Sequence, residues 1–373
     1  MFYFVHLFLI ACVLAIWPMA PNDVFWKPKE IVFIVGALAL IQTIFLNRSV
    51  ITFKNKYLTA VSLYVTVLFA YYFLCSLLSK NLTVNVWNLL PSLNAMLAVL
   101  LIVALVKVTN SLDDWLKLTK TLSALSVCVA CYAIFQYFGF DTFSVKMLHS
   151  NPIFTVFGNT FLTACFLSIT APFLLVYESK THKVCFAIVL LAILLCDSLM
   201  GMIAISTSTV LYYLLLRKWK VVLGVLSLIA VCIYWFSPTH NIVFFDPIRW
   251  ALWTDVINQI KESTLIGNGL GSFALQDWTN NITSSNTHAA HNDFLQLWYE
   301  GGIVLLVLLG FYFKDLFNRL RQMQGSRILY GYVTSFVAFL LNMLTAFPMR
   351  IAGIAVVGIL TVAFMEVYAH DTI

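Results

Sequence analysis

Apolar residues run in long stretches along most of the chain, and polar residues gather in short segments between them. A helix needs about 20 mostly apolar residues to cross the hydrocarbon core of a bilayer, within a range of roughly 17 to 25. The pattern therefore predicts an all-α polytopic membrane protein. We expect about twelve transmembrane helices, in the runs 2–20, 31–46, 58–78, 88–106, 121–140, 154–177, 184–197, 200–216, 221–236, 302–313, 329–346 and 351–368.

Four of these runs allow a second interpretation. Only a short polar turn separates 184–197 from 200–216, and a single long helix there would leave eleven spans. The run 302–313 is short, so we expect its helix to begin earlier, near Phe294. The first run has no basic residue before Lys27 and no clear cleavage site, so we interpret it as a span and not as a signal peptide.

The composition excludes several classes of protein. Hydrophobic residues make up 61% of the 373 residues, charged residues make up 10%, and the mean hydropathy is +0.92. A soluble domain carries about 25% charged residues because its surface faces water. All eight cysteines lie in or at the ends of apolar runs, so we expect Cys128 and Cys131 to pack in the core. A soluble enzyme, a disordered chain and a disulfide scaffold are excluded.

The basic residues predict an orientation. Fifteen of the 22 Lys and Arg residues fall in the loops that alternate from 47–57 onward, and seven fall in the opposite set. The positive-inside rule places the first set in the cytoplasm with both termini, so the net charge of +6 indicates orientation and not nucleic-acid binding. We expect helices 1–9 in residues 1–236, an outer loop carrying the chemistry in 237–301, and helices 10–12 in 302–373.

The outer loop begins with a predicted amphipathic helix over 247–263. Asp246 can cap this helix and Pro247 suits its first position. Arg249 and Trp253 are four residues apart and share a face. Arg249 is either an interfacial side chain beside an aromatic anchor or a phosphate-binding group at headgroup level. The apolar stripe of the helix contains Ile248, Leu252, Val256 and Ile260.

Two further segments of the outer loop can carry chemistry. The glycines at 267, 269 and 271 predict a tight turn or a close approach of backbone to a ligand. Asn286 or Thr287 can cap a helix that begins at His288, which would place His288 and His291 on one face near an anion-binding helix end. These histidines are surface residues without a role, metal ligands with Asp293 or Glu300 as a third ligand, or, for His291, a general base.

Seven motifs resemble those of the O-antigen ligase superfamily and keep its order from about residue 135 to residue 350. They are Gln136-Tyr137-Phe138-Gly139, Phe157-Gly158-Asn159-Thr160-Phe161-Leu162, Arg249-x-x-x-Trp253, Gly267-x-Gly269-x-Gly271-x-Phe273, His291-Asn292-Asp293-x-Leu295, Glu300-Gly301-Gly302 and Phe347-Pro348. Members of this superfamily are bacterial inner-membrane glycosyltransferases with a large periplasmic loop. They include O-antigen ligases, O-antigen and exopolysaccharide polymerases, and protein O-oligosaccharyltransferases.

The resemblance implies a chemistry and a set of partners. The donor is a glycan on undecaprenyl diphosphate, used without nucleotide, metal or other cofactor. The acceptor is lipid A–core or a growing glycan, the site lies on the periplasmic face of the inner membrane, and no nucleic acid takes part. His291 is expected to be the catalytic base and Arg249 a diphosphate ligand. Further candidates for substrate binding are Arg350, Trp253, His288, Asn292, Glu300, Gly269 and Gly271.

General chemistry agrees with this implication. Diphosphate is a good leaving group, and the charge that develops on it favours the bidentate fork of Arg. The acceptor hydroxyl loses its proton during the attack, which suits a His side chain, and direct displacement inverts the anomeric centre.

One departure from the family pattern concerns the outer turn between spans seven and eight. The superfamily usually carries a Ser-Arg pair there, whereas this chain has Ser198 followed by Leu199. Arg350 or Lys146 can supply the missing positive charge if the fold brings either one close.

Two other functions stay open. A polymerase of the same superfamily is the nearest alternative, and the compact chain favours a ligase only weakly. A secondary transporter is the alternative from another class. It is less favoured because the charged residues cluster at the ends of the predicted spans and not near the bilayer midplane.

Overall fold

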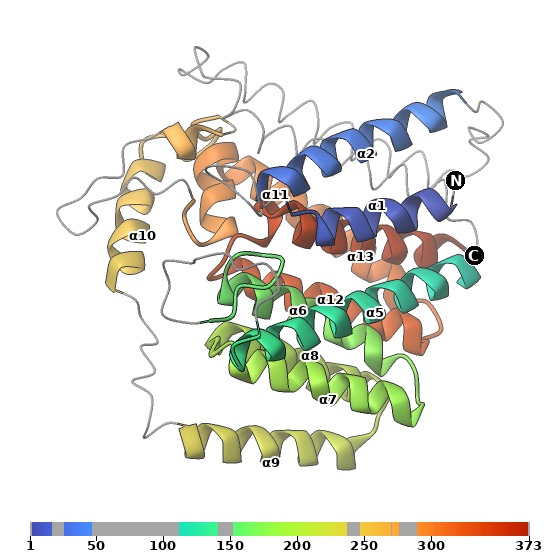
Figure 1. Cartoon of the computed structure of the whole chain (residues 1–373). Helices are drawn as coiled ribbons and strands as arrows, with labels where there is room; N and C mark the ends of the chain where they lie inside the picture. Colours follow the sequence, from blue (N-terminus) through green and yellow to red (C-terminus); the bar gives the residue numbers. More distant parts are fainter. Residues whose placement is uncertain are drawn as a thin grey trace.

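The computed structural model describes residues 2–16, 26–46, 112–140, 152–236, 247–269, 271–275 and 289–371. In this part of the chain the structure is helical and has no β-strand (Figure 1). Two short 3-10 helices, η2 (Ser272–Leu275) and η3 (Pro348–Arg350), lie between longer helices. The α-helices are α1 (Phe2–Leu14), α2 (Trp26–Leu46), α5 (Leu112–Tyr137), α6 (Thr160–Leu175), α7 (Lys180–Leu195), α8 (Leu199–Leu215), α9 (Trp219–Phe236), α10 (Pro247–Ile260), α11 (Asp293–Arg321), α12 (Arg327–Met343) and α13 (Ala352–Asp371).

The prediction of an all-α architecture is confirmed for the described residues. The predicted spans 58–78 and 88–106 lie outside them, and each of the other predicted spans overlaps a helix. Among the described residues, three helices are long and apolar enough to cross a membrane: Leu112–Tyr137, Asp293–Arg321 and Ala352–Ala369. Large apolar side chains are also exposed on several helices, as expected of a surface that faces lipid. The number of spans stays a prediction.

Helices α7 and α8 are separate, so the single long helix considered above is excluded. α7 ends at Leu195, and Asp197 adopts a left-handed backbone conformation with φ of 50°. The side chain of Ser198 then caps α8 by accepting a hydrogen bond of 3.3 Å from the backbone N–H of Gly201. Gly201 also brings α8 close to α6, since a Cβ atom there would lie 2.8 Å from the Cβ of Ala164.

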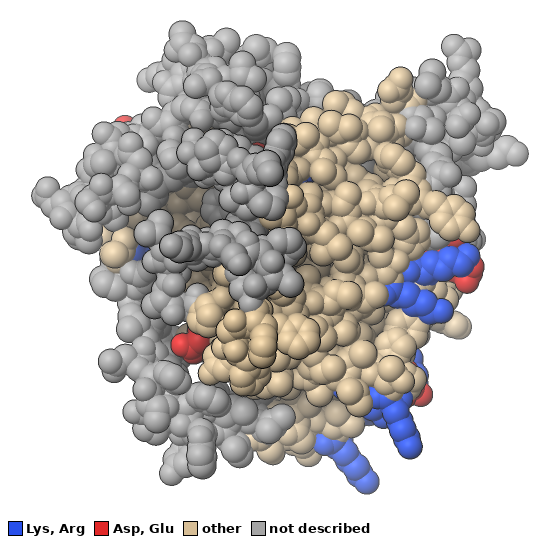
Figure 2. All heavy atoms as spheres, viewed as in Figure 1, with Lys and Arg blue, Asp and Glu red and all other residues tan. Residues whose placement is uncertain are grey.

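The helices give the molecule two distinct ends. Both chain termini lie at one end, together with the connections from α6 to α7 and from α8 to α9 (Figure 1). Lys and Arg side chains gather at this end on the face shown in Figure 2. The start of α11 and the 3-10 helix η3 lie at the opposite end (Figure 1). Both ends of the chain thus lie on one side of the molecule, and the topology across a membrane stays a prediction.

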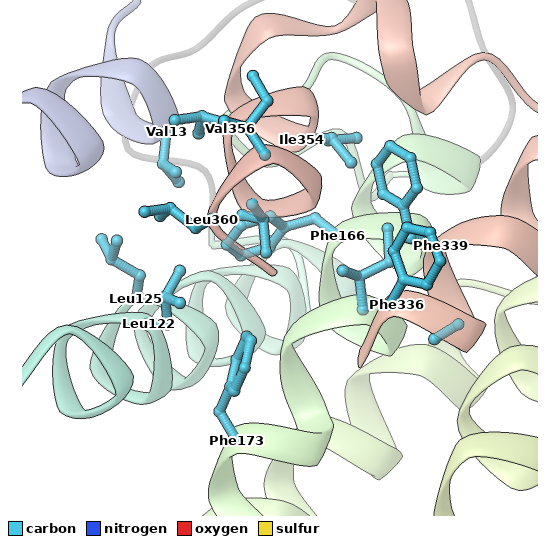
Figure 3. Packing of buried hydrophobic residues seen from close by; sticks show 14 of the residues in the cluster. Val13, Leu122, Leu125, Phe166, Phe173, Phe336, Phe339, Ile354, Val356 and Leu360 are labelled. Atoms are coloured by element: carbon cyan, nitrogen blue, oxygen red, sulfur yellow. The ribbon is translucent and has the colours of Figure 1, made fainter. Parts of the chain in front are cut away.

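The core forms around α13, which packs against α1, α2, α6, α11 and α12. A helix that is apolar on all sides is buried on all sides, and 89% of the most apolar stretch of α13 is buried. Its Phe364 ring stacks on Tyr332 of α12 at 3.9 Å, and Trp115 of α5 contacts both rings edge-on. Figure 3 shows apolar side chains of α1, α5, α6, α12 and α13 directed toward this core.

Buried hydroxyl and amide groups link three of the helices. Asn342 of α12 donates to Ser168 of α6 at 3.0 Å, and Thr170 of α6 donates to Ser126 of α5 at 2.9 Å. The Ser335 hydroxyl of α12 donates to the backbone carbonyl of Ile169 at 2.7 Å. Such bonds between helices contribute about 0.6 kcal/mol each on average in a membrane bundle. Here they fix α12 against α6.

Candidate functional site

Helix α11 is broken at the outer boundary of the predicted tenth span. Gly302 has φ of 69° and ψ of 178°, which is far from helical geometry. In a continuous helix, the carbonyls of Tyr299 and Glu300 would accept hydrogen bonds from the N–H groups of Ile303 and Val304. The segment 264–269 lies along the break, and its backbone bonds to all four of these groups.

Four backbone hydrogen bonds join this segment to the broken helix. Asn268 N–H donates to the Tyr299 carbonyl and Gly269 N–H to the Glu300 carbonyl, each at 2.9 Å. In the other direction, Ile303 N–H donates to the Thr264 carbonyl at 2.9 Å and Val304 N–H to the Leu265 carbonyl at 3.4 Å. The inserted segment thereby satisfies the polar groups that the break releases, as irregular backbone buried in a membrane protein requires.

Glycine is needed where the two backbones meet. Gly267 has φ of 77°, and a Cβ atom there would lie 2.5 Å from the backbone nitrogen of Gly302 and 2.6 Å from the carbonyl oxygen of Glu300. Gly269 and Gly271 also have positive φ values, of 94° and 74°. Gly267 and Gly269 thus allow the loop to approach α11 closely. A structural contact therefore accounts for these two positions of the glycine motif.

Helix α10 packs over the first turns of α11 through a small apolar cluster of its own. Leu252, Val256 and Ile260 are buried, as the predicted stripe requires, whereas Ile248 is 46% exposed. They pack with Phe273 of η2 and Tyr299 of α11. The helix ends at Ile260, three residues before the predicted end.

The face of α10 that carries Arg249 and Trp253 contacts two loops of the site. The Arg249 guanidinium donates from Nη1 to the carbonyl of Thr345 at 3.0 Å and lies 5.6 Å from the centre of the Phe161 ring. The Trp253 indole donates to the carbonyl of Ala290 at 2.8 Å. One helix face therefore connects the segment before His291 with the segment before η3.

The predicted helix start at His288 is wrong. Helix α11 begins at Asp293, and the Asn292 side chain caps it by accepting a 3.0 Å hydrogen bond from the Leu295 N–H. His291 precedes this cap with φ of 52°, so its backbone is left-handed and not helical. The helix begins after Asn292 because the amide oxygen of this side chain accepts a hydrogen bond from a free N–H group of the first turn. His288 lies outside the described residues.

The ring of His291 packs edge-on against Phe347, with 5.0 Å between the ring centres. A left-handed conformation is uncommon for a residue other than glycine, and it persists where the surrounding contacts fix it. Here Trp253 binds the carbonyl on one side of His291, and the Asn292 cap fixes the other side. The imidazole is thus presented at the N-terminal end of α11.

Arg350 of η3 lies between two buried carboxylates of α11. Its Nη2 is 3.1 Å from Oε1 of Glu300, and its Nε is 3.8 Å from Oδ1 of Asp293. The Asp293 carboxylate also accepts a 3.0 Å hydrogen bond from the backbone N–H of Met349. The side chain of Arg350 is 16% exposed, whereas those of Asp293 and Glu300 are 2% and 5% exposed. These bonds hold η3 against the first turns of α11.

The loop from Leu344 to Ile351 is the point where most of the predicted site residues meet. Arg249 contacts it through Thr345, His291 through Phe347 and Glu300 through Arg350. Asn292 and Trp253 fix the neighbouring backbone, and Gly269 binds the carbonyl of Glu300. No described contact links Gly271 to this loop. Lys146, the other candidate for the missing charge, lies outside the described residues.

The sequence predicted no role for Gln296, and it indicated Asp293 only as part of a motif and as an alternative third metal ligand. Gln296 accepts from the backbone N–H of Ala290 at 3.1 Å and donates to Glu300 at 3.0 Å. Gln136 of the motif near residue 135 accepts from the N–H groups of Phe154 and Thr155, which fixes the loop before α6. Polar residues inside an otherwise apolar helix are the signal that could have indicated these buried links.

The arrangement can hold an anion and move a proton. Arg249 supplies a cation, the α11 N-terminus adds the positive end of a helix dipole, and His291 supplies an acid–base group, whereas Glu300 and Asp293 balance the charge of Arg350. Among the described residues, no three His, Cys, Asp or Glu side chains form a group able to hold a metal ion. The chain matches no protein-family model and has no significant match among curated proteins.

Proposed function

We propose that this chain is a membrane glycosyltransferase of the O-antigen ligase type. Its donor would be a glycan linked to undecaprenyl diphosphate, and lipid A–core is the favoured acceptor. The observation that carries the proposal is that Arg249 and His291, from two separate motifs of the resemblance, both contact the loop that carries Arg350. Both the predicted topology and the opposite position of the termini favour an outer, periplasmic location.

The proposed reaction assigns one task to each group. The acceptor hydroxyl attacks the anomeric carbon of the donor while the imidazole of His291 takes its proton. The bond between that carbon and the diphosphate oxygen breaks, and undecaprenyl diphosphate leaves with the electron pair. The guanidinium of Arg249 binds the diphosphate and stabilises the charge that develops on it. Attack from the face opposite the leaving group inverts the anomeric configuration.

Arg350 has a different place in this proposal. Glu300 and Asp293 neutralise its charge and hold it against α11. It is therefore a positioning residue for the loop that carries Phe347. In this assignment Arg249 carries most of the electrostatic stabilisation that the absent Ser-Arg pair would share.

The test uses the full chain in lipid nanodiscs with a labelled undecaprenyl-diphosphate glycan. One shifted product that needs lipid A–core supports a ligase, and a ladder of longer glycans without it supports a polymerase. His291→Ala should abolish transfer while leaving the unfolding transition near that of the parent. His6→Gln is the matched control, because His6 bonds to Thr121 on α5 and stands outside the proposed site. If the parent transfers no glycan, either with lipid A–core or without it, the proposal is overturned.

One observation favours the transporter alternative. Broken helices commonly form the substrate or ion sites of transporters, and α11 carries the buried Glu300 two residues before its break. Flux of the labelled donor or of protons through proteoliposomes, without any transfer product, would favour this function over glycosyl transfer.

A further inference from the structure

A pocket lies at the end of the molecule that carries the chain termini, far along the helices from η3. It opens between the α6–α7 connection, the α8–α9 connection and the start of α12, and its volume is 210 Å³. Pockets for drug-sized ligands measure about 300–1,000 Å³, so this one suits a small polar group. Its charged lining residues are Glu178, Lys183, Lys218 and Arg327.

Positive charge exceeds negative charge in this pocket. The Glu178 carboxylate Oε1 lies 3.1 Å from Lys218 Nζ and 2.5 Å from Arg327 Nη2. Within the described part of the chain, Lys183 has no ion-pair partner. One carboxylate therefore faces three cations. The hydrogen bonds from Arg327 and Lys218 lower the pKa of Glu178 to about 2, which shows how strongly the surroundings favour an anion.

Two of the cations lie at helix N-termini, where the helix dipole makes a positive charge unfavourable. Lys183 lies in the first turn of α7, and Arg327 is the first residue of α12. Positive side chains are stabilising at helix C-termini and unfavourable at N-termini, and neither helix has an acidic residue in its first turn. A bound anion would remove this unfavourable interaction at both helix ends.

The walls of the pocket are fixed by hydrogen bonds that do not involve its charges. Tyr212 donates to the Leu175 carbonyl at 2.7 Å, and Tyr177 donates to the Leu116 carbonyl at 3.0 Å. The charged groups in contrast are open to solvent, since the side chains of Lys218, Arg327 and Glu178 are 43%, 41% and 55% exposed. A ligand can therefore reach the cations without any rearrangement of the helices.

We infer that this pocket binds one phosphate group, with Lys183, Lys218 and Arg327 as its ligands and Glu178 as the internal anion that it displaces. Basic pockets between membrane helices at the headgroup level bind anionic lipids in this way. The clustering of Lys and Arg at this end in Figure 2 agrees with a position near headgroups. The phosphate belongs either to an anionic lipid such as phosphatidylglycerol or to a soluble phosphate compound. This inference does not depend on the proposed function.

The experiment compares the parent with three variants of the full chain. Lys183→Gln combined with Lys218→Gln removes two ligands, and Glu178→Gln removes the competing anion. Lys180→Gln combined with Lys220→Gln is the matched control, because it changes the net charge equally at two lysines that do not line the pocket. The probes are nanodiscs of phosphatidylcholine with and without phosphatidylglycerol, and inorganic phosphate. The readouts are retained lipid by native mass spectrometry and the apparent melting temperature.

We expect the pocket double variant to bind the probe at least tenfold more weakly and the control double variant to stay within twofold of the parent. Glu178→Gln should bind several-fold more tightly, since the phosphate then meets no carboxylate. Stabilisation by phosphatidylglycerol alone identifies a lipid headgroup, and stabilisation by inorganic phosphate in phosphatidylcholine nanodiscs identifies a soluble ligand. Equal binding by the parent and both double variants overturns the inference, and so does weaker binding by Glu178→Gln.

Discussion

Replacing Gly302 by alanine should disrupt the break in α11 and the segment bound to it. The φ and ψ values of this residue fall in a region that is essentially restricted to glycine, where another residue costs about 1–3 kcal/mol. The added Cβ would also lie 2.5 Å from the Leu265 carbonyl carbon and 2.6 Å from that of Ile266, so the loop must move away. Opening the bonds from Ile303 and Val304 to this loop adds about 1 kcal/mol for each. We therefore expect a loss of about 3–5 kcal/mol.

Gly310 provides a control within the same helix. A Cβ atom at Gly310 meets nothing within 4 Å, and its backbone is helical. Gly310→Ala should therefore leave stability unchanged or raise it by up to about 1 kcal/mol. Unfolding of both variants is measured by titration with sodium dodecyl sulfate in mixed micelles, with helicity followed by circular dichroism. If Gly302→Ala unfolds at the same detergent fraction as Gly310→Ala, the break does not depend on glycine and the reasoning fails.

Three further predictions concern charged residues. Glu366→Ala removes the carboxylate that accepts two hydrogen bonds from Arg319, at 3.0 and 3.2 Å. The same detergent titration should show that the free energy of unfolding falls by about 3–5 kcal/mol, and a fall below about 1 kcal/mol would contradict a buried ion pair. Because the pKa of Glu178 lies near 2 in the folded state and 4.5 is its ordinary value, its stabilising contribution is complete above about pH 4.5 and is lost as the pH falls toward 2. Melting temperatures from pH 6 to pH 3 should therefore fall more steeply for the parent than for Glu178→Gln, and parallel curves would refute this. Arg249→Lys keeps the charge but loses the guanidinium fork, so the donor concentration for half-maximal transfer should rise several-fold; an unchanged value would count against diphosphate binding.

The positions of several helices could be predicted because the information is local. The polar turn at Asp197 and Ser198 interrupts an apolar run, and the structure breaks the helix there. The stripe of α10 was predicted because residues four positions apart share a helix face, and Leu252, Val256 and Ile260 are buried. The start of α11 was misplaced because Asn286, Thr287 and Asn292 all have side chains suited to capping, and the sequence alone does not rank them.

The contacts of the candidate site could not be predicted in the same way. Glu300 and Arg350 were proposed as separate substrate ligands, whereas the structure pairs them across 50 positions of the chain. The glycine motif was interpreted as a turn or a ligand contact, whereas Gly267 and Gly269 lie against the break in α11. Neither pairing has a signal in residue spacing, since each depends on how two distant segments fold against each other.

The sequence by itself determined that this chain is helical and suited to lipid. Its charged residues are too few to cover a soluble surface, and a helix satisfies its own backbone within each apolar run. The tertiary structure decided where that rule is broken. At Gly302 the backbone groups of α11 bond to a loop 31 or more positions away, and Arg249 and His291 contact the loop that carries Arg350. Bonds between distant segments depend on packing, and packing is a property of the whole bundle.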